Sequence, residues 1–270
     1  MATPTLGEAT RARYLYGIVR TDRRPALEDV VGVGGGPLSF VEEGPLAAVV
    51  GDVAREDLVP PEAEPEGAAW LERAVLAHER VLERCLEPGP VLPMRFATTL
   101  RADGDLRTLL RERAAEFASV LERLLGRREW GVKALLRAPD KLVRSVQASR
   151  SDLAARAAEL DDRSPGAAYL ARKQLDRELV LAGDDLIDEL VDAAHRRLAT
   201  CATESTITGA SQPRPERVYL NAAYLVEELE ERAFRETLAE LGREHAEVGL
   251  EYELTGPWPA YNFVDDELRR

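Results

Sequence analysis

The sequence has few of the side chains that build disulfide frameworks, metal centres or membrane spans. It holds two cysteines, Cys85 and Cys201, and three histidines in 270 residues, which excludes a disulfide scaffold and most cysteine-based zinc sites. Basic residues are outnumbered by acidic ones: 36 Lys and Arg stand against 49 Asp and Glu, so the net charge of −13 argues against nucleic acid as a partner. No apolar run approaches the ~20 residues that span a bilayer, and no secretion signal is visible. We therefore expect a soluble cytoplasmic protein with no membrane partner.

The first half of the chain combines strand-forming and helix-forming patterns. Residues rich in β-formers predict a strand and then a hairpin that turns at Gly44-Pro45. Apolar residues at spacings of three and four predict helices, and an internal proline places the strand between them at a sheet edge. We expect an N-terminal mixed α/β domain, a ferredoxin-like variant, over residues 1–128. Its expected elements are the strands Tyr14–Val19, Leu38–Asp52 (hairpin) and Val91–Phe96, and the helices Leu71–Cys85 and Asp105–Leu125.

The second half has a different order of elements. A strand at Trp130–Leu136 is followed by two long apolar repeats that predict an antiparallel helical hairpin at about 140–198. Two strands, an acidic helix and a final alternating strand then complete a β–αα–β–β–α–β order. This order predicts a C-terminal ferredoxin-like α+β domain over 129–254, with the hairpin inserted, and a separate tail at 255–270. The protein as a whole is predicted to be α+β with two domains.

One acidic motif gives the alternative functional hypothesis. Asp184, Asp185 and Asp188 match the DDxxD pattern that binds magnesium, so a magnesium- or nucleotide-dependent enzyme would use these carboxylates. A helical wheel instead places Asp184 and Asp188 opposite an apolar stripe through Leu186, so these two are expected to face solvent. Tyr169 and Lys173 fit the YxxxK pattern of short-chain dehydrogenases, but no Rossmann domain precedes them. The apolar stripe comprises Leu175, Leu179, Ala182, Leu186, Leu190 and Ala193.

Other candidate chemical residues have structural interpretations. His78 starts an HExxH-like pattern, but Leu82 stands where the second zinc-binding histidine belongs. Since His78 lies on an apolar helix face, we expect a hydrogen-bonded core residue. Arg95 lies inside an apolar strand, which predicts a carboxylate partner in the core. The glycine run 32–36 is followed by a strand rather than a helix, so it does not fit a dinucleotide loop. We therefore expect no enzyme activity, no catalytic or cofactor-binding residue, and no metal site.

The C-terminal segment TGPWPAYNFV (255–264) concentrates aromatic residues. Trp258, Tyr261 and Phe263 lie among prolines that are expected to prevent regular structure. Such rings either strap back onto the body of the protein or face a binding partner.

Five segments occur here in the order seen in the gas vesicle protein family GvpF/GvpL, and the chain resembles that family from Tyr14 to Val264. The tail is the most specific of the five. Ala97 stands where the family usually has glycine, and Ala260 where it commonly has a second proline; the choice between F and L members stays open. The segments are YLYGIV (14–19), VLPMRF (91–96), EWGVKALL (129–136), VYLNAAYLV (218–226) and TGPWPAYNFV (255–264).

The resemblance implies an accessory protein of gas vesicle formation rather than an enzyme. Members are minor components associated with the vesicle shell, so we expect this chain at gas vesicles in the cytoplasm, without a cofactor. The expected partners are the small hydrophobic shell protein GvpA, whose aggregation they limit during nucleation, and other gas vesicle accessory proteins. A high net negative charge would help to keep such a client in solution.

Overall fold

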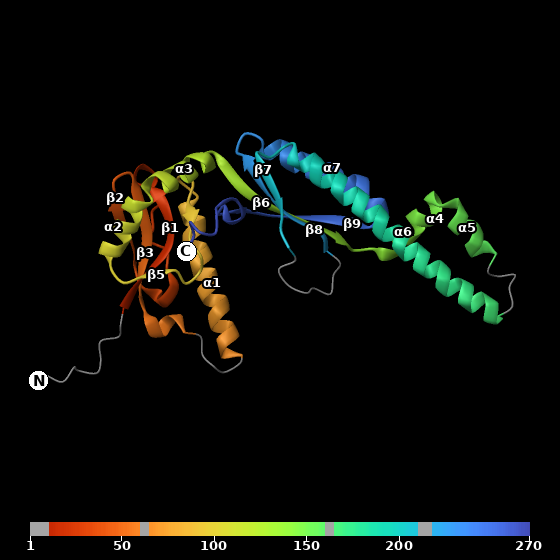
Figure 1. The fold of residues 1–270 in the computed structure, drawn as a ribbon, viewed down its shortest axis with the longest axis horizontal. Helices are drawn as coiled ribbons and strands as arrows, with labels where there is room; N and C mark the ends of the chain where they lie inside the picture. Colours follow the sequence, from red (N-terminus) through yellow and green to blue (C-terminus); the bar gives the residue numbers. More distant parts are fainter. Residues whose placement is uncertain (1–10, 60–64, 160–164, 210–217) are drawn as a thin grey trace, which may run out of the picture. The chain divides into compact units, whose positions relative to one another are not determined.

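The chain divides into two compact units, each described by itself. The computed structural model describes residues 11–59, 65–159, 165–209 and 218–270 (Figure 1). Unit 1 comprises Met1–Arg128 and Trp258–Arg270, and unit 2 comprises Glu129–Pro257. In sequence, unit 2 is therefore inserted into unit 1. Each unit has its own antiparallel sheet with packed helices, so the α+β prediction is confirmed.

The sheet of unit 1 has the strand order β2-β3-β1-β4, and β5 also pairs with β1. The β2–β3 hairpin turns at Gly44, whose φ of 58° suits glycine. The strand predicted at Val91–Phe96 shortens to two residues at the edge of the sheet, where Pro93 lies opposite Gly17 of β1 and its missing N–H removes no ladder bond. The strands are β1 (Arg11–Arg20), β2 (Leu38–Glu43), β3 (Leu46–Ala54), β4 (Leu92–Pro93) and β5 (Thr99–Leu100).

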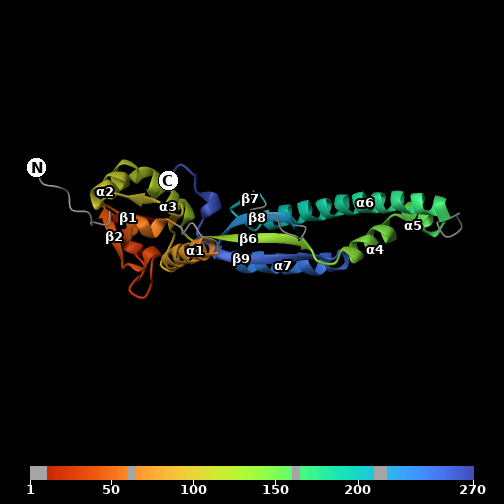
Figure 2. The same cartoon turned by 90° about the horizontal axis from the view of Figure 1, so that it is seen from below.

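Helices cover both faces of this sheet, which explains why β1 is buried along most of its length. Helix α1 (Glu66–Cys85) packs on one face, where it meets Tyr14 and Tyr16. Helices α2 (Asp103–Glu112) and α3 (Ala114–Leu124) lie on the other (Figures 1 and 2). The single helix predicted over 105–125 is wrong, because the chain breaks at Arg113, whose φ and ψ are −106° and 17°.

Unit 2 has the predicted element order, and its sheet runs β7-β8-β6-β9. Unit 1 shows the equivalent strand order, with a loop over residues 21–37 where the first helix of a ferredoxin-like unit would lie. The strands are β6 (Arg127–Leu136), β7 (Glu204–Ile207), β8 (Val218–Glu227) and β9 (Leu250–Trp258), and the helices are α4 (Pro139–Ser149), α5 (Ser151–Ala158), α6 (Pro165–Ala199) and α7 (Glu231–His245).

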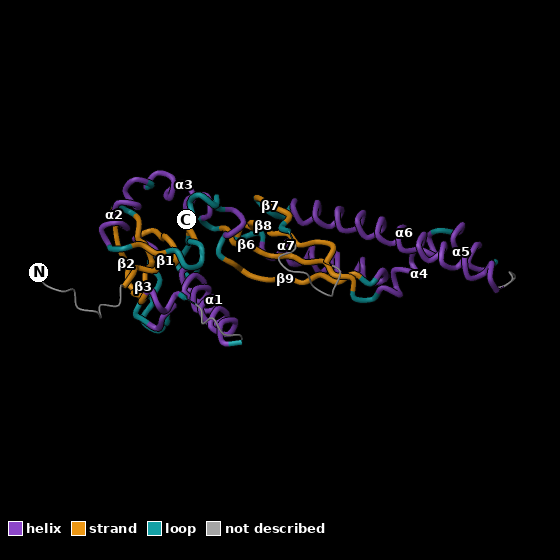
Figure 3. The backbone as a smooth tube through the Cα atoms, turned by 60° about the horizontal axis from the view of Figure 1, so that its bottom comes forward, coloured by secondary structure: helices purple, strands orange, loops and turns teal. Residues whose placement is uncertain are grey.

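The predicted helical hairpin is formed by α4 and α5, which lie along α6 (Figure 3). Its first arm was predicted as one helix, and this is wrong: the chain breaks at Arg150, whose φ and ψ are −111° and 85°. An ion pair between Arg156 on α5 and Glu178 on α6 ties the two arms together. Among the described residues, no helix combines the length and apolar character needed to cross a membrane.

The apolar stripe predicted on α6 changes position along the helix. Leu175 and Leu179 are buried as predicted, at 4% and 7% exposure. Further along, the fully buried positions include Ile187 and Val191, one residue later than the predicted stripe. The reason is that the two halves of α6 have different neighbours: the first packs on α4 and α5, and the second on β8 of the sheet.

Candidate functional site

The aromatic tail packs on unit 1. The expectation that prolines exclude regular structure is wrong for its first residues, because β9 continues through Pro257 to Trp258, which is partly buried. Strand β9 is an edge strand, where a proline is tolerated. A 3₁₀ turn (Tyr261–Phe263) follows, and it buries the Phe263 ring to 7% exposure.

Tyr261 is held from two sides. Its hydroxyl donates a hydrogen bond of 2.8 Å to Glu79 on α1. The Arg269 guanidinium lies over the Tyr261 ring, 4.9 Å from the centroid, and donates a 3.0 Å bond to its carbonyl oxygen. Burial raises the pKa of the Glu79 carboxyl and of the Tyr261 hydroxyl, so the tyrosine stays a donor at neutral pH.

Arginines of unit 1 hold the remainder of the tail. The Arg95 amide donates to the Arg269 carbonyl oxygen at 2.9 Å, and Arg113 donates to the Glu267 carbonyl oxygen at 2.9 Å. The Arg95 guanidinium pairs with Asp266 at 2.6 Å. The predicted carboxylate partner exists, but the expected core location is wrong, because the two side chains are 39% and 63% exposed.

His78 lies in an aromatic cluster beneath the tail. Its ring stacks on Tyr16 and meets the edges of Tyr14 and Phe96, and it is 1% exposed. The Tyr14 hydroxyl accepts a bond from the Ala97 amide at 2.9 Å and lies 3.0 Å from Nδ1 of His78. Because burial disfavours the charged imidazolium, the His78 ring is neutral at neutral pH. Burial lowers the pKa of His78 to about 4.

The acidic motif does not converge. Asp184 accepts a 3.2 Å hydrogen bond from the Tyr219 hydroxyl of β8, whereas Asp185 and Asp188 are exposed. Within the described ranges no group of three or more His, Cys, Asp or Glu side chains is arranged to hold a metal ion. The geometry therefore gives the magnesium-dependent enzyme no support. Burial raises the pKa of the Cys85 thiol to about 12, which disfavours a nucleophilic thiolate.

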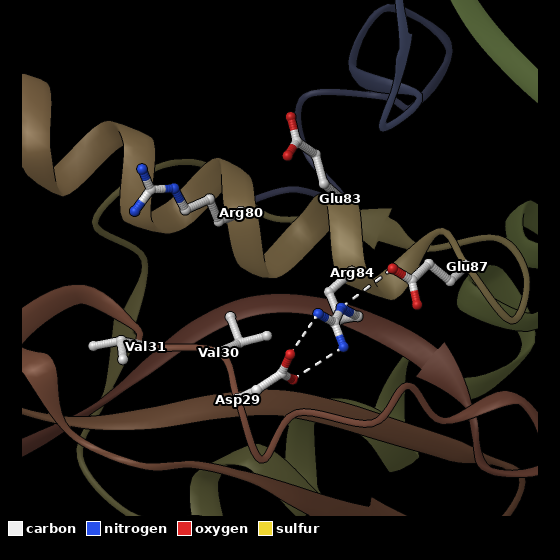
Figure 4. A pocket seen from close by; sticks show the side chains of 7 residues that line it. All are labelled: Asp29, Val30, Val31, Arg80, Glu83, Arg84 and Glu87. Atoms are coloured by element: carbon white, nitrogen blue, oxygen red, sulfur yellow. Dashed lines mark hydrogen bonds and ion pairs between the residues drawn. The ribbon is translucent and has the colours of Figure 1, made fainter.

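A groove of about 410 Å³ runs between α1 and the loop after β1 (Figure 4). Arg84 forms a two-pronged bond to Asp29 at 2.9 and 3.0 Å and also pairs with Glu87, which pins the loop to the helix. The groove is lined by Asp29, Val30, Val31, Arg80, Glu83, Arg84 and Glu87. No sequence motif marked this groove, because the loop and α1 are far apart in the chain.

Residues 32–35 of the glycine run line a second hollow, of about 270 Å³. Trp70 also lines it, and it shares Val31 with the groove. The run is needed for close packing: a Cβ on Gly32 would lie 2.3 Å from the Tyr16 hydroxyl oxygen. That hydroxyl accepts a 2.7 Å bond from the Val33 amide. The glycines therefore fit the loop onto the sheet. The two hollows adjoin at Val31, whose apolar side chain is exposed.

The strand orders, the packed tail and the two adjoining hollows define an α+β protein of two units. The family model for gas vesicle synthesis protein GvpL/GvpF matches residues 12–265. The chain belongs to this gas vesicle protein family.

Relatives and solved structures agree along nearly the whole chain. Gas vesicle protein L of Streptomyces sp. (strain CB03234) is 34% identical, with 94% of this chain and 93% of that protein covered. Gas vesicle protein F2 of Halobacterium salinarum is 30% identical, over 93% and 91%. The crystal structure of GvpF from Anabaena sp. PCC7120 superposes with a TM-score of 0.67 at 18% identity, covering 94% of this chain and 96% of that one.

Proposed function

We propose that this gas vesicle protein acts as an assembly factor: a minor shell-associated component, in the cytoplasm, that binds the shell protein GvpA and limits its aggregation during nucleation. Other gas vesicle accessory proteins are its further partners. The observation that carries the proposal is the family match over residues 12–265. No enzymatic step is part of it.

Two physical features of the chain support this role. Val31, where the two hollows adjoin, is 63% exposed, and the partly buried Trp70 lines the second hollow. Apolar side chains of this kind suit a hydrophobic client. The net charge of −13 would keep a complex with an aggregation-prone client dispersed, since like-charged particles repel each other.

The test is an aggregation assay with purified GvpA. GvpA is diluted from denaturant with and without an equimolar amount of the chain, and light scattering is followed; tagged GvpA is then used to capture the chain. We expect slower scattering and co-purification. The control is an unrelated soluble protein of similar size and net charge, which separates specific binding from charge repulsion. Suppression no greater than that of the control, together with no co-purification, would refute the proposal.

A further inference from the structure

Helix α6 exposes four large apolar side chains in its N-terminal half. Tyr169 and Leu170 are both 68% exposed, Val180 is 49% exposed and Leu181 is 64% exposed. The members of each pair, Tyr169 with Val180 and Leu170 with Leu181, are eleven residues apart, about three helical turns, so they share one side of the helix. We call these four residues, with Lys173 and Arg177 between them, the overhang stripe.

The overhang stripe lies on the side of α6 opposite the hairpin contact. Leu175 and Leu179 form the buried side, packed with Leu142 of α4 and Leu153 of α5. The first half of α6 is therefore apolar on two faces, of which the hairpin covers one. A polar outer face is the norm for a surface helix, so the second apolar face requires an explanation.

The exposed face continues a buried one. Counting seven and then four residues on from Val180 gives Ile187 and Val191, which are 0% and 4% exposed and pack on the sheet. The Tyr219 hydroxyl of β8 reaches Asp184, between the two halves. Toward its N-terminus, α6 extends past the strands of unit 2 (Figures 2 and 3). The face that meets the sheet in the second half is thus exposed in the first, and no described segment covers it.

The charges on the overhang stripe are positive. Lys173 and Arg177 are exposed, lie one turn apart, and form no ion pair with any residue in the described ranges. Nearby, Glu178 is already paired with Arg156, and exposed carboxylates lie at Asp176, on the edge of the stripe, and at Asp185, one turn beyond Leu181. Two cations that have no ion pair among the described residues therefore lie between apolar side chains in a chain whose net charge is −13.

We propose that the overhang stripe binds an amphipathic helix of another protein, one whose apolar face is flanked by Asp or Glu residues spaced four apart. Apolar contacts would bury the four side chains, and the acidic residues would pair with Lys173 and Arg177. A second copy of this chain fits less well. If two copies pair antiparallel about Leu175, Lys173 of one copy lies against Arg177 of the other. If they pair in parallel, each residue lies against its own equivalent. Both arrangements bring like charges together, which is unfavourable. The inference does not rest on GvpA binding.

The experiment uses the full chain and synthetic peptides of about 20 residues, long enough to form a helix. One peptide has a leucine stripe flanked by glutamates; the other has lysines in place of the glutamates. Binding is measured by fluorescence anisotropy of the labelled peptide. We expect the acidic peptide to bind at least tenfold more tightly than the basic one. The double variant Leu170→Glu/Leu181→Glu should weaken that binding at least tenfold, whereas Leu229→Glu, at a 92% exposed leucine elsewhere in unit 2, should leave it unchanged.

Charge reversal distinguishes this proposal from nonspecific hydrophobic binding. The variant Lys173→Glu/Arg177→Glu should prefer the basic peptide, which reverses the selectivity of the natural chain. The melting temperature of each variant checks that it is folded, and Leu181→Ser replaces the double variant if that one melts early. Equal binding of both peptides, or an unchanged preference after charge reversal, would overturn the proposal. So would concentration-dependent self-association in sedimentation that Leu170→Glu abolishes, because the occupant would then be a second copy.

Discussion

Tyr261→Phe removes a polar contact that joins the aromatic tail to α1. The variant keeps the ring under Arg269 but removes the hydroxyl that donates to Glu79 at 2.8 Å. A hydrogen bond to a charged group contributes about 1.5–3 kcal/mol. Because Glu79 is only partly buried and water can replace some of the lost bond, we expect a loss of about 1.5 kcal/mol in the free energy of unfolding at neutral pH.

The loss should depend on pH in a defined direction. Burial raises the pKa of Glu79 above its ordinary 4.5, and the Tyr261 hydrogen bond opposes that rise. Removing this hydrogen bond raises the folded-state pKa of Glu79 further. The variant therefore destabilises the folded state most when the Glu79 carboxylate is ionised. A group with a raised folded-state pKa loses stability as pH rises through that pKa. The effect of Tyr261→Phe should therefore be full at neutral pH and shrink toward about 0.5–1 kcal/mol near pH 4, where a neutral hydrogen bond is lost.

Urea denaturation followed by tryptophan fluorescence measures both values. The matched control is Tyr169→Phe, which removes the hydroxyl of a tyrosine that is 68% exposed on α6 and should change neither curve. An unfolding midpoint equal to that of the natural chain, or a loss of the same size at both pH values, would show that the hydroxyl does not anchor the tail through Glu79.

Three further substitutions test unit 1. Phe263→Ala removes the ring of a residue that is 7% exposed, and calorimetry should show a loss of about 3 kcal/mol in the free energy of unfolding. A loss below about 1 kcal/mol would contradict the packing of the tail on unit 1. Ala97 has a φ of 66°, in the left-handed region, so Ala97→Gly should raise stability by up to about 1 kcal/mol, and a lower melting temperature would contradict this. Burial lowers the pKa of His78 from 6.5 to about 4. The contribution of the neutral ring to the free energy of unfolding is therefore complete above pH 6.5, and on the order of 3 kcal/mol is lost as the pH falls toward 4. His78→Gln should flatten this slope in urea titrations, and an unchanged slope would assign it to other groups.

The elements with strong periodic patterns could be predicted from the sequence. The run at Tyr14–Val19 lies within β1, and the hairpin at Leu38–Asp52 corresponds to β2 and β3, because β-branched and aromatic residues there are bounded by a Gly-Pro turn. The order of elements in unit 2 also followed from the pattern. The resemblance to the gas vesicle family depends on segments in β1, β6 and β8 and on two segments, 91–96 and 255–264, that extend beyond β4 and β9. The family match over 12–265 confirms it.

What the sequence could not show depends on contacts between distant residues. Neither Arg113 nor Arg150 is a helix breaker, and the apolar spacing continues across both, so a local pattern predicts unbroken helices. Arg95 pairs with Asp266, far along the chain, which no local spacing indicates. The groove beside Asp29 likewise forms between α1 and a loop, and the strands β2 and β3 separate these two segments in the sequence.

The magnitudes of the tail contacts indicate which tail residues matter for unit 1. The Arg95–Asp266 pair is exposed on both sides, and such pairs contribute about 0–1 kcal/mol. Burying the Phe263 ring contributes about 3 kcal/mol, and the Tyr261 hydroxyl about 1.5 kcal/mol. The aromatic side chains therefore account for most of the stabilisation of the tail, and the exposed ion pairs mainly orient it. Because unit 2 separates these aromatic residues from the rest of unit 1 in sequence, unit 1 gains this stabilisation only once the C-terminal end of the chain is present.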